Sequence, residues 1–473
     1  MQIKYTAPKH VSEVLASLGR TEDVKLSPSN RRLAIASFLR NKIAIFDFQL
    51  TTTPNGKQVA LEDATEISSP YFNYPHGIDF IDEETIIVVN RGGEVPILKL
   101  PPVGNKSEVS KPLEVIRASE TNFLDTPGSV AVIRKDKRLF EVLICNNSAH
   151  YLTRHLLNVS TGCSVQGSEI LIKKWLQIPD GVCVSRDKRW IAVSNHRMQN
   201  VLLYEYTSAL NERSDPDGIL RLGGYPHGLR FTPDGQFILV ADAGAPYVHI
   251  YGKHGSSWRG VRNPLTSLKV MSDEVFSRGQ HNPQEGGPKG LDIDTGNGIL
   301  VTTCECQPLA FFDLNTVRES ALCDSFGAAE RRGKRFNPAQ SQARWRHQSL
   351  MDVRYELDVK HRLDQSEARA SLAEEQAIQA EARANQAVEQ ALQAEARASQ
   401  AVEQAIQADL RAKLVKARAQ QIKAGATQAE ARAHKSEARA NHAAAQVAAL
   451  TSSTSWRIMA PLRSFVSALR NRY

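Results

Sequence analysis

The chain has 473 residues, enough for more than one domain, and 41% of them are hydrophobic. Lys and Arg number 59 against 51 Asp and Glu, and a net charge of +8 is too dilute over this length to indicate a nucleic-acid-binding protein. No run of 18 apolar residues is present, so the sequence predicts no membrane-spanning helix.

The start of the chain and its cysteines indicate the compartment. The first twenty residues alternate polar and apolar side chains and lack the apolar core of a signal peptide. Six cysteines are scattered along the chain without the pattern of a disulfide framework. We therefore expect a cytoplasmic protein with reduced cysteines.

The composition changes near residue 325. Residues 1–320 hold most of the Pro, Gly, β-branched and aromatic residues, in short runs broken by turn signals. Residues 365–450 are dominated by Ala, Gln, Glu and Arg. A basic linker at 321–364 joins these two segments, and residues 451–473 form a tail of different composition. We expect four segments with these boundaries.

Residues 1–320 repeat one pattern, in which a Pro-x-Gly turn, a strand, a polar turn, a β-branched strand, a loop and a third strand follow one another. The aligned middle residues of the turns are Glu22, His76, Gly128, Asp180, His227 and Lys289, and the copies that begin at Glu22, Pro127 and Pro288 are weaker. A repeat of this length, with room for a fourth strand, is typical of a propeller blade, so we predict an all-β propeller of six blades. A β-sandwich is the alternative, but it does not explain the recurring turn. The long interval after His227 predicts a loop insertion at 253–287.

Residues 365–424 predict one long α-helix with an unusual stripe, and Gly425 predicts a break or kink at its end. Alanines recur at alternating spacings of three and four residues from Ala370 to Ala412, which is typical of a coiled-coil seam. Because alanine buries little area, association through this seam should be modest in strength. We expect self-association through residues 370–412. The alternative is a single alanine-stabilised helix that pairs with nothing.

The tail predicts a short basic amphipathic helix. After Pro461, apolar residues follow the i, i+3, i+4, i+7 rule, and the only charged residues near them are arginines. Such a helix can lie on an anionic membrane surface or dock on a partner protein through residues 456–472. Capping of the coiled coil is the other interpretation.

One mouth of the propeller channel is the predicted site. The inner strand of each blade lines the channel, so the middle residues of the turns should ring one mouth, and the second strands should end on the same face. We expect ligand binding there by His76, His227, Lys289, Asn90, Asn146, Asn195 and Asp242.

Two pairs of ring residues predict a metal site. In a six-bladed ring, Glu22 faces Asp180 and His76 faces His227. Two carboxylates and two imidazoles can hold one divalent ion, oxygens suiting Ca²⁺ or Mg²⁺ and imidazoles favouring Zn²⁺ or Mn²⁺. We take Glu22 and Asp180 as candidate ligands. The alternative is an anionic sugar or phosphate held by His76, His227 and Lys289.

The segment from Gln177 to Cys183, followed by Trp190 to Val193, resembles the fourth-blade motif of the SMP-30/gluconolactonase family. That resemblance implies a six-bladed propeller that opens sugar lactones with a divalent metal, and it makes Asp180 both a metal ligand and the catalytic base. A first-blade glutamate ligand maps onto Glu22, whereas Gly128 stands where the family has an asparagine ligand.

Two further resemblances concern the whole repeat region and the C-terminal tail. The repeat pattern of residues 20–315 is similar to that of YncE- and lactonase-type bacterial propellers. The tail Ser-Thr-Ser-Trp-Arg-Ile-Met-Ala-Pro-Leu-Arg at 453–463 resembles an element that follows long coiled coils in bacterial glycosyltransferases and methyltransferases of surface-polysaccharide assembly. This implies a shared docking site or pathway. No βαβ alternation is present, so we expect no transferase domain.

These patterns predict a bacterial binding or scaffold protein of cell-surface polysaccharide assembly, without catalytic activity, whose ligand or partner binds at the propeller mouth. We expect it to be peripheral at the inner membrane through its tail and to bind no nucleic acid. The alternative is a metal-dependent hydrolase of sugar lactones or esters, with Asp180 as its base.

Overall fold

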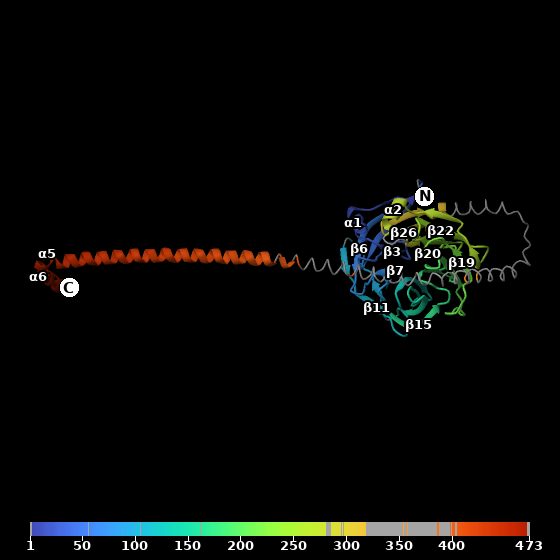
Figure 1. Cartoon of the computed structure of the whole chain (residues 1–473), viewed down its shortest axis with the longest axis horizontal. Helices are drawn as coiled ribbons and strands as arrows, with labels where there is room; N and C mark the ends of the chain where they lie inside the picture. Colours follow the sequence, from blue (N-terminus) through green and yellow to red (C-terminus); the bar gives the residue numbers. More distant parts are fainter. Residues whose placement is uncertain are drawn as a thin grey trace, which may run out of the picture. The chain divides into compact units, whose positions relative to one another are not determined.

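The computed structural model describes residues 2–317 apart from 55, 105, 161, 281–284, 295 and 297, the single residues 353, 357, 386 and 398, and residues 400–470 apart from 403. The chain divides into two units, Met1–Gln365 and Ser366–Tyr473. The first contains six sheets arranged around a centre, and the second contains a long helix (Figure 1). The predicted six-bladed propeller and the predicted helix after it are confirmed.

The first three blades follow one another along the chain, and each begins with its innermost strand. Blade 1 contains β3 (Thr21–Leu26), β4 (Arg32–Ser37), β5 (Lys42–Thr53) and β6 (Gly56–Ser68), with β2 (Tyr5–Thr6) and β10 (Lys106–Val109) paired to β6. Blade 2 contains β7 (Pro75–Phe80), β8 (Thr85–Asn90), β9 (Val95–Lys99) and β11 (Pro112–Ile116). Blade 3 contains β12 (Pro127–Arg134), β13 (Leu139–Asn146), β14 (Tyr151–Asn158) and β15 (Ser164–Ile172).

The last three blades complete the ring. Blade 4 contains β16 (Pro179–Val184), β17 (Trp190–Asn195), β18 (Asn200–Glu205), β19 (Gly218–Arg221) and β23 (Gly260–Arg262). Blade 5 contains β20 (Pro226–Phe231), β21 (Phe237–Asp242), β22 (Tyr247–Gly252) and β24 (Thr266–Lys269). Blade 6 contains β25 (Gly290–Ile293), β26 (Ile299–Cys304), β27 (Gln307–Asp313) and β1 (Gln2–Ile3). Among the described residues of this unit, two helices are α1 (Lys9–Ser17) and α2 (Asp273–Gly279).

The outer edge of blade 6 comes from the other end of the propeller sequence. Strand β1 pairs antiparallel with β27, so that Gln2 lies opposite Phe312 and Ile3 opposite Phe311. The chain thereby closes the ring with backbone hydrogen bonds between its first and last propeller strands, and the edge of β27 does not remain unpaired.

The prediction that the insertion at 253–287 is a loop was wrong. The segment contains two strands and helix α2. Strand β24 pairs with β22 and is the fourth strand of blade 5, while β23 adds to blade 4 in parallel with β19. The segment is structured because its strands satisfy the backbone hydrogen bonds of blades that would otherwise end at an open edge.

Close contact between neighbouring inner strands explains the recurring glycine of the Pro-x-Gly turns. A Cβ on Gly77 would lie 2.7 Å from Cα of Ser129 in the next blade. One on Gly228 would lie 2.6 Å from the carbonyl oxygen of Lys289. No side chain fits at such distances, so glycine allows the blades to pack tightly around the channel.

Two residues of the predicted linker pack on the propeller. Val353 and Leu357 are each 1% exposed and belong to the apolar cluster that Leu176, Ile191 and other residues of blades 3 and 4 form. Most of the predicted linker, including the basic run at 331–335, lies outside the described residues.

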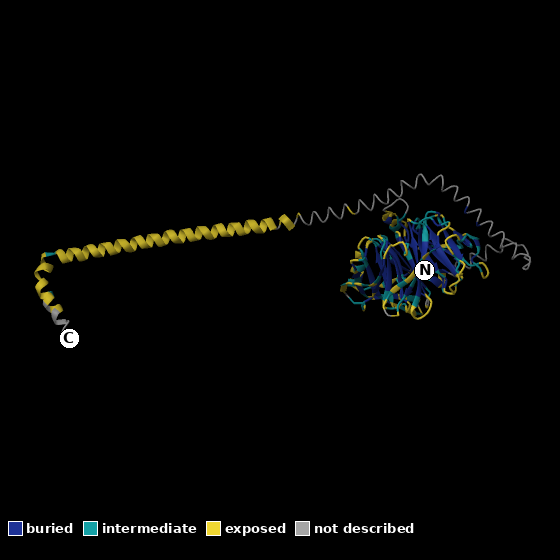
Figure 2. Ribbon diagram, turned by 90° about the horizontal axis from the view of Figure 1, so that it is seen from below, coloured by how far each residue is buried: buried dark blue, intermediate teal, exposed yellow. Residues whose placement is uncertain are grey.

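The described part of the second unit is a long exposed helix followed by two short ones. Every described residue of 400–452 is helical, and all of them are exposed (Figure 2). The helix continues through Gly425, so the predicted break there is wrong, because a single glycine inside an alanine-rich helix costs too little to end it. The alanine stripe between 370 and 399 lies almost wholly outside the described residues, so self-association through 370–412 stays a prediction. None of the described helices combines the length and the apolar character needed to cross a bilayer.

Candidate functional site

Five of the six aligned turn residues meet at the channel mouth. Four of them belong to inner strands, Glu22 in β3, His76 in β7, Asp180 in β16 and His227 in β20, and Lys289 directly precedes β25. All five residues are buried, with exposed fractions between 1% and 5%. The sixth, Gly128 in β12, contributes a carbonyl oxygen that lies 2.6 Å from Nδ1 of His76.

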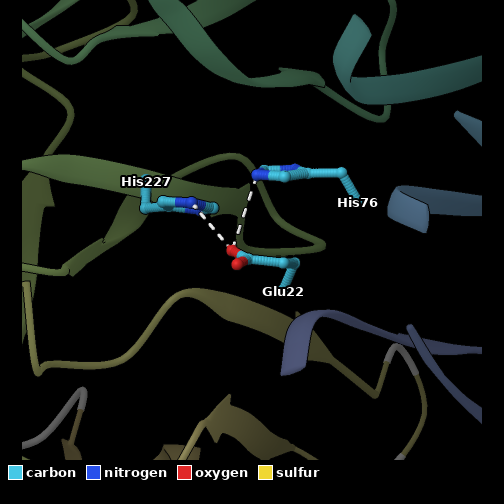
Figure 3. A group of neighbouring side chains, drawn as sticks. All are labelled: Glu22, His76 and His227. Carbon is cyan, nitrogen blue, oxygen red and sulfur yellow. Dashed lines mark ion pairs between the residues drawn. The ribbon is translucent and has the colours of Figure 1, made fainter. Parts of the chain in front are cut away.

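Glu22 lies beside two stacked imidazoles that come from opposite blades of the ring. Its Oε2 is 3.5 Å from Nε2 of His76 and 3.5 Å from Nε2 of His227 (Figure 3). The two rings stack with centroids 5.3 Å apart and planes 18° apart. Oε2 is buried and accepts no hydrogen bond from the described residues.

The other carboxylate oxygen of Glu22 is paired with cations. Arg20 donates to Oε1, and Nζ of Lys289 lies 3.3 Å from the same atom. Burial opposes ionisation, but Arg20 and Lys289 hold the pKa of Glu22 well below its ordinary value. Glu22 is therefore ionised at neutral pH, and its Oε2, which faces the two histidines, shares the negative charge.

Asp180 completes the cluster. Its Oδ2 lies 2.9 Å from Nε2 of His227, and its Oδ1 accepts hydrogen bonds from Arg91 at 3.3 Å and from Asn147 at 2.8 Å. Burial raises the pKa of this carboxyl, but the charges of His227 and Arg91 outweigh it and hold the pKa well below the usual range. Asp180 is thus a second ionised carboxylate in the buried mouth.

The two histidines have opposite protonation states although both come from Pro-His-Gly. Burial favours neutral His227, but Asp180 and Glu22 outweigh it and raise its pKa to about 9. Burial and the charge of Arg91 lower the pKa of His76 to about 3. Arg91 donates to Nε2 of His76 at 2.9 Å, so the proton of this neutral ring is on Nδ1, directed at Gly128.

Three residues of this cluster were not predicted from the sequence: Arg20, Arg91 and Asn147. Arg91 and Asn147 each directly follow a strand-end asparagine that was singled out, so the signal was one residue away. A Cβ on Gly128 would overlap Oδ1 of Asn147 and would lie 2.8 Å from Oδ1 of Asp180. Asn147 therefore occupies the room that the missing side chain of Gly128 leaves.

Glu285, also missed, extends the cluster on the Lys289 side. Its Oε2 lies 2.8 Å from Nζ of Lys289, and its Oε1 lies 3.4 Å from Nε2 of His196. Burial raises the pKa of Glu285, but Lys289 and His196 outweigh it and lower the pKa overall. Lys289 thus links two carboxylates, the buried one of Glu22 and the partly buried one of Glu285.

The four residues predicted to bind a ligand at the ends of the second strands have a common structural role. Each accepts a backbone N–H from the turn that leads into the inner strand of its own blade. The acceptors and donors are Asn90 with Asn73, Asn146 with Asp125, Asn195 with Gln177, and Asp242 with Tyr225. These bonds hold the Pro-x-Gly turns in place. Ligand binding by the four residues stays a prediction.

The residues present fit a divalent ion. A tetrahedral ion with bonds of about 2.1 Å separates its ligand atoms by about 3.4 Å. Two of the distances in the cluster, between Oε2 of Glu22 and each histidine Nε2, are 3.5 Å, and all three atoms lie within 4.8 Å of one another. Oε2 of Glu22 points the same way, because it is a buried ionised oxygen that accepts no hydrogen bond from the described residues and so offers its lone pairs to a cation.

No protein-family model and no curated protein matches the sequence. Solved structures that resemble the chain include a candidate 6-phosphogluconolactonase from Bacteroides fragilis, with 10% identity over 60% of this chain and 76% of that chain and a TM-score of 0.38. A candidate gluconolactonase has 12% identity over 62% and 89%, with a TM-score of 0.41. A luciferin-regenerating enzyme has 12% identity over 61% and 86%, with a TM-score of 0.40.

At these identities and TM-scores the likenesses do not indicate a shared activity. The comparisons give no support to the resemblance between the tail and glycosyltransferases.

Proposed function

We propose that the propeller mouth is a metal-dependent hydrolytic site for a lactone or another ester. The observation that carries the proposal is the buried Oε2 of Glu22, which is ionised, has no hydrogen-bond partner among the described residues and faces two imidazole nitrogens. Glu22, His76 and His227 would hold the ion, with Asp180 beside them. Nitrogen and oxygen ligands in this mixture favour Zn²⁺ or Mn²⁺.

A divalent ion bound there would supply Lewis-acid polarisation of the ester carbonyl. Asp180 accepts the proton of the attacking water, because its carboxylate is ionised and Arg91 and Asn147 fix its Oδ1. The water oxygen bonds to the acyl carbon, the bond from the acyl carbon to the alcohol oxygen breaks, and the proton passes from Asp180 to that oxygen. The carboxylic acid formed then releases the second proton of the water to solvent and becomes a carboxylate.

Arg91 has two roles in this scheme. It donates to Nε2 of His76, so it must release this bond before His76 can act as a ligand. Once released, its guanidinium remains beside Asp180, where it can pair with the carboxylate that ester hydrolysis produces.

Metal content and hydrolysis of the full chain test the proposal together. The purified protein is loaded in turn with Zn²⁺, Mn²⁺, Ca²⁺ or Mg²⁺, desalted, and measured by elemental analysis. Hydrolysis of a sugar lactone and of a nitrophenyl ester is followed before and after chelation. We expect about one ion per chain and hydrolysis that chelation abolishes. Failure to retain any of the four ions would overturn the proposal.

Metal binding should depend on pH, because the proton of His227 competes with the ion for Nε2. The pKa of His227 is about 9, whereas His76, with a pKa of about 3, is neutral at physiological pH. Raising the pH removes the competing proton, so the apparent affinity should increase about tenfold per pH unit from neutrality up to about pH 9 and then level off. Calorimetric titration in buffers of different ionisation enthalpy measures the affinity and the proton released. A constant affinity across this range contradicts ligation by His227.

A binding or scaffold role is the second candidate, and the exposed helix favours it. Val402, Ile406 and Leu410 recur every four residues on one side of this helix and are 56% to 60% exposed. A surface of this kind is suited to association with another helix. Participation in polysaccharide assembly stays a prediction from the tail motif.

A further inference from the structure

The two short helices that end the described chain are fixed to each other. In α5 (Thr454–Ile458), the side chain of Ser453 caps the first turn by accepting the N–H of Trp456 at 3.3 Å. From α6 (Ala460–Arg470), Arg463 donates to the carbonyl oxygen of Trp456, and its guanidinium carbon lies 3.2 Å from the centre of the indole ring. These contacts connect α5 and α6, so the exposed residues of the two helices lie near one another, and we call them together the tail surface.

That surface is apolar and exposed. The exposed side chains are Trp456 at 44%, Ile458 at 71%, Met459 at 49%, Leu462 at 57% and Val466 at 56%. Leu462 and Val466 are one turn apart and therefore lie on the same face of α6. So much apolar area within eleven residues marks an interaction surface, because scattered surface residues do not cluster in this way.

The charges of the tail select the class of partner. Between 438 and 473 the sequence has no Asp or Glu, and from 453 onward it has four arginines. A second copy of the tail would bring the same charges and be repelled. An anionic lipid surface offers phosphate groups to the arginines and an acyl region to the apolar side chains, and tryptophan favours that boundary.

We propose that α5 and α6 bind the surface of an anionic lipid bilayer and lie in its interfacial region. The pair is too short to span a bilayer, so the attachment is peripheral. This function is independent of the propeller mouth, because it uses no residue of the metal cluster.

Sedimentation of the full chain with lipid vesicles tests the proposal. One vesicle preparation is pure phosphatidylcholine and the other also contains phosphatidylglycerol. We expect partitioning at least about tenfold higher on the anionic vesicles, and weaker in raised salt. Equal partitioning on both vesicles overturns the proposal, and absence of binding to either overturns it in favour of a protein partner.

Variants of the full chain locate the surface. Leu462→Ser with Val466→Ser should lower partitioning on anionic vesicles by more than about tenfold, because two apolar side chains no longer enter the interface. Arg457→Gln with Arg463→Gln should remove the preference for anionic over neutral vesicles. The matched control is Val109→Ser with Leu113→Ser, which changes two exposed apolar residues of the propeller. Binding unaffected by both tail variants, or equally reduced in the control, overturns the proposal.

Discussion

Replacing Glu22 with Gln is expected to abolish metal retention and to lower ester hydrolysis by more than about 100-fold. The substitution keeps the shape of the side chain but removes the negative charge from Oε2, the buried oxygen 3.5 Å from both histidine Nε2 atoms. An amide oxygen is a much weaker ligand than a carboxylate for a divalent ion. Elemental analysis after desalting and the lactone assay measure the two effects.

The matched control is Glu84→Gln, since the side chain of Glu84 is 65% exposed and pairs only with a surface lysine among the described residues. It should retain the ion and the activity. Glu22→Gln also removes the carboxylate that pairs with Arg20 and Lys289, so it changes the charge balance of the mouth as well as the metal ligand. His76→Gln serves as a second variant because the ring of His76 is neutral and its removal changes no charge. Full metal content in both site variants would show that the cluster is not the metal site.

Replacing Gly181 with Ala should lower the free energy of unfolding by about 3 kcal/mol or more. The added Cβ would overlap the carbonyl oxygen of His227 in the next blade and would lie 2.7 Å from Cδ2 of Leu229. The inner strands β16 and β20 must separate to accept it. Since Asp180 and His227 belong to these strands, the metal affinity should fall as well. Denaturant unfolding monitored by tryptophan fluorescence measures the loss of stability.

Gly223→Ala is the control for this substitution. A Cβ there has no heavy atom within 4 Å among the described residues, so the free energy of unfolding should change by less than about 0.5 kcal/mol. Equal stability of the two variants would contradict the close inner-strand packing that we use to explain the repeated glycine.

Part of this arrangement is determined locally and was therefore accessible from the sequence. A Pro-x-Gly turn leads into four of the six inner strands, and weaker copies of it at Glu22 and Gly128 lead into the other two. The spacing of these turns along the chain predicts six blades, and their middle residues predict the ring at the mouth. Glu22, His76, Asp180 and His227 come together because each occupies the same position in its repeat. A periodic pattern of this kind places side chains without knowledge of the individual contacts.

Other features depend on residues far apart in the chain and could not be derived from the repeat. Strand β1 pairs with β27 across some three hundred residues, and no local pattern specifies that partner. Asn147 contacts Asp180 from a neighbouring blade because Gly128 leaves room for it. Val353 and Leu357 are buried on blades 3 and 4, although their sequence environment reads as a linker.

The two histidines show most clearly which properties followed from the sequence and which required the tertiary structure. The sequence by itself determined that His76 and His227 occupy equivalent positions, because both lie in Tyr-Pro-His-Gly, and it gave no reason for them to differ. Only the tertiary structure decided that the pKa is about 3 for His76 and about 9 for His227. The physical reason is the neighbour that the fold supplies to each buried ring, a cation from Arg91 in one case and the carboxylate of Asp180 in the other.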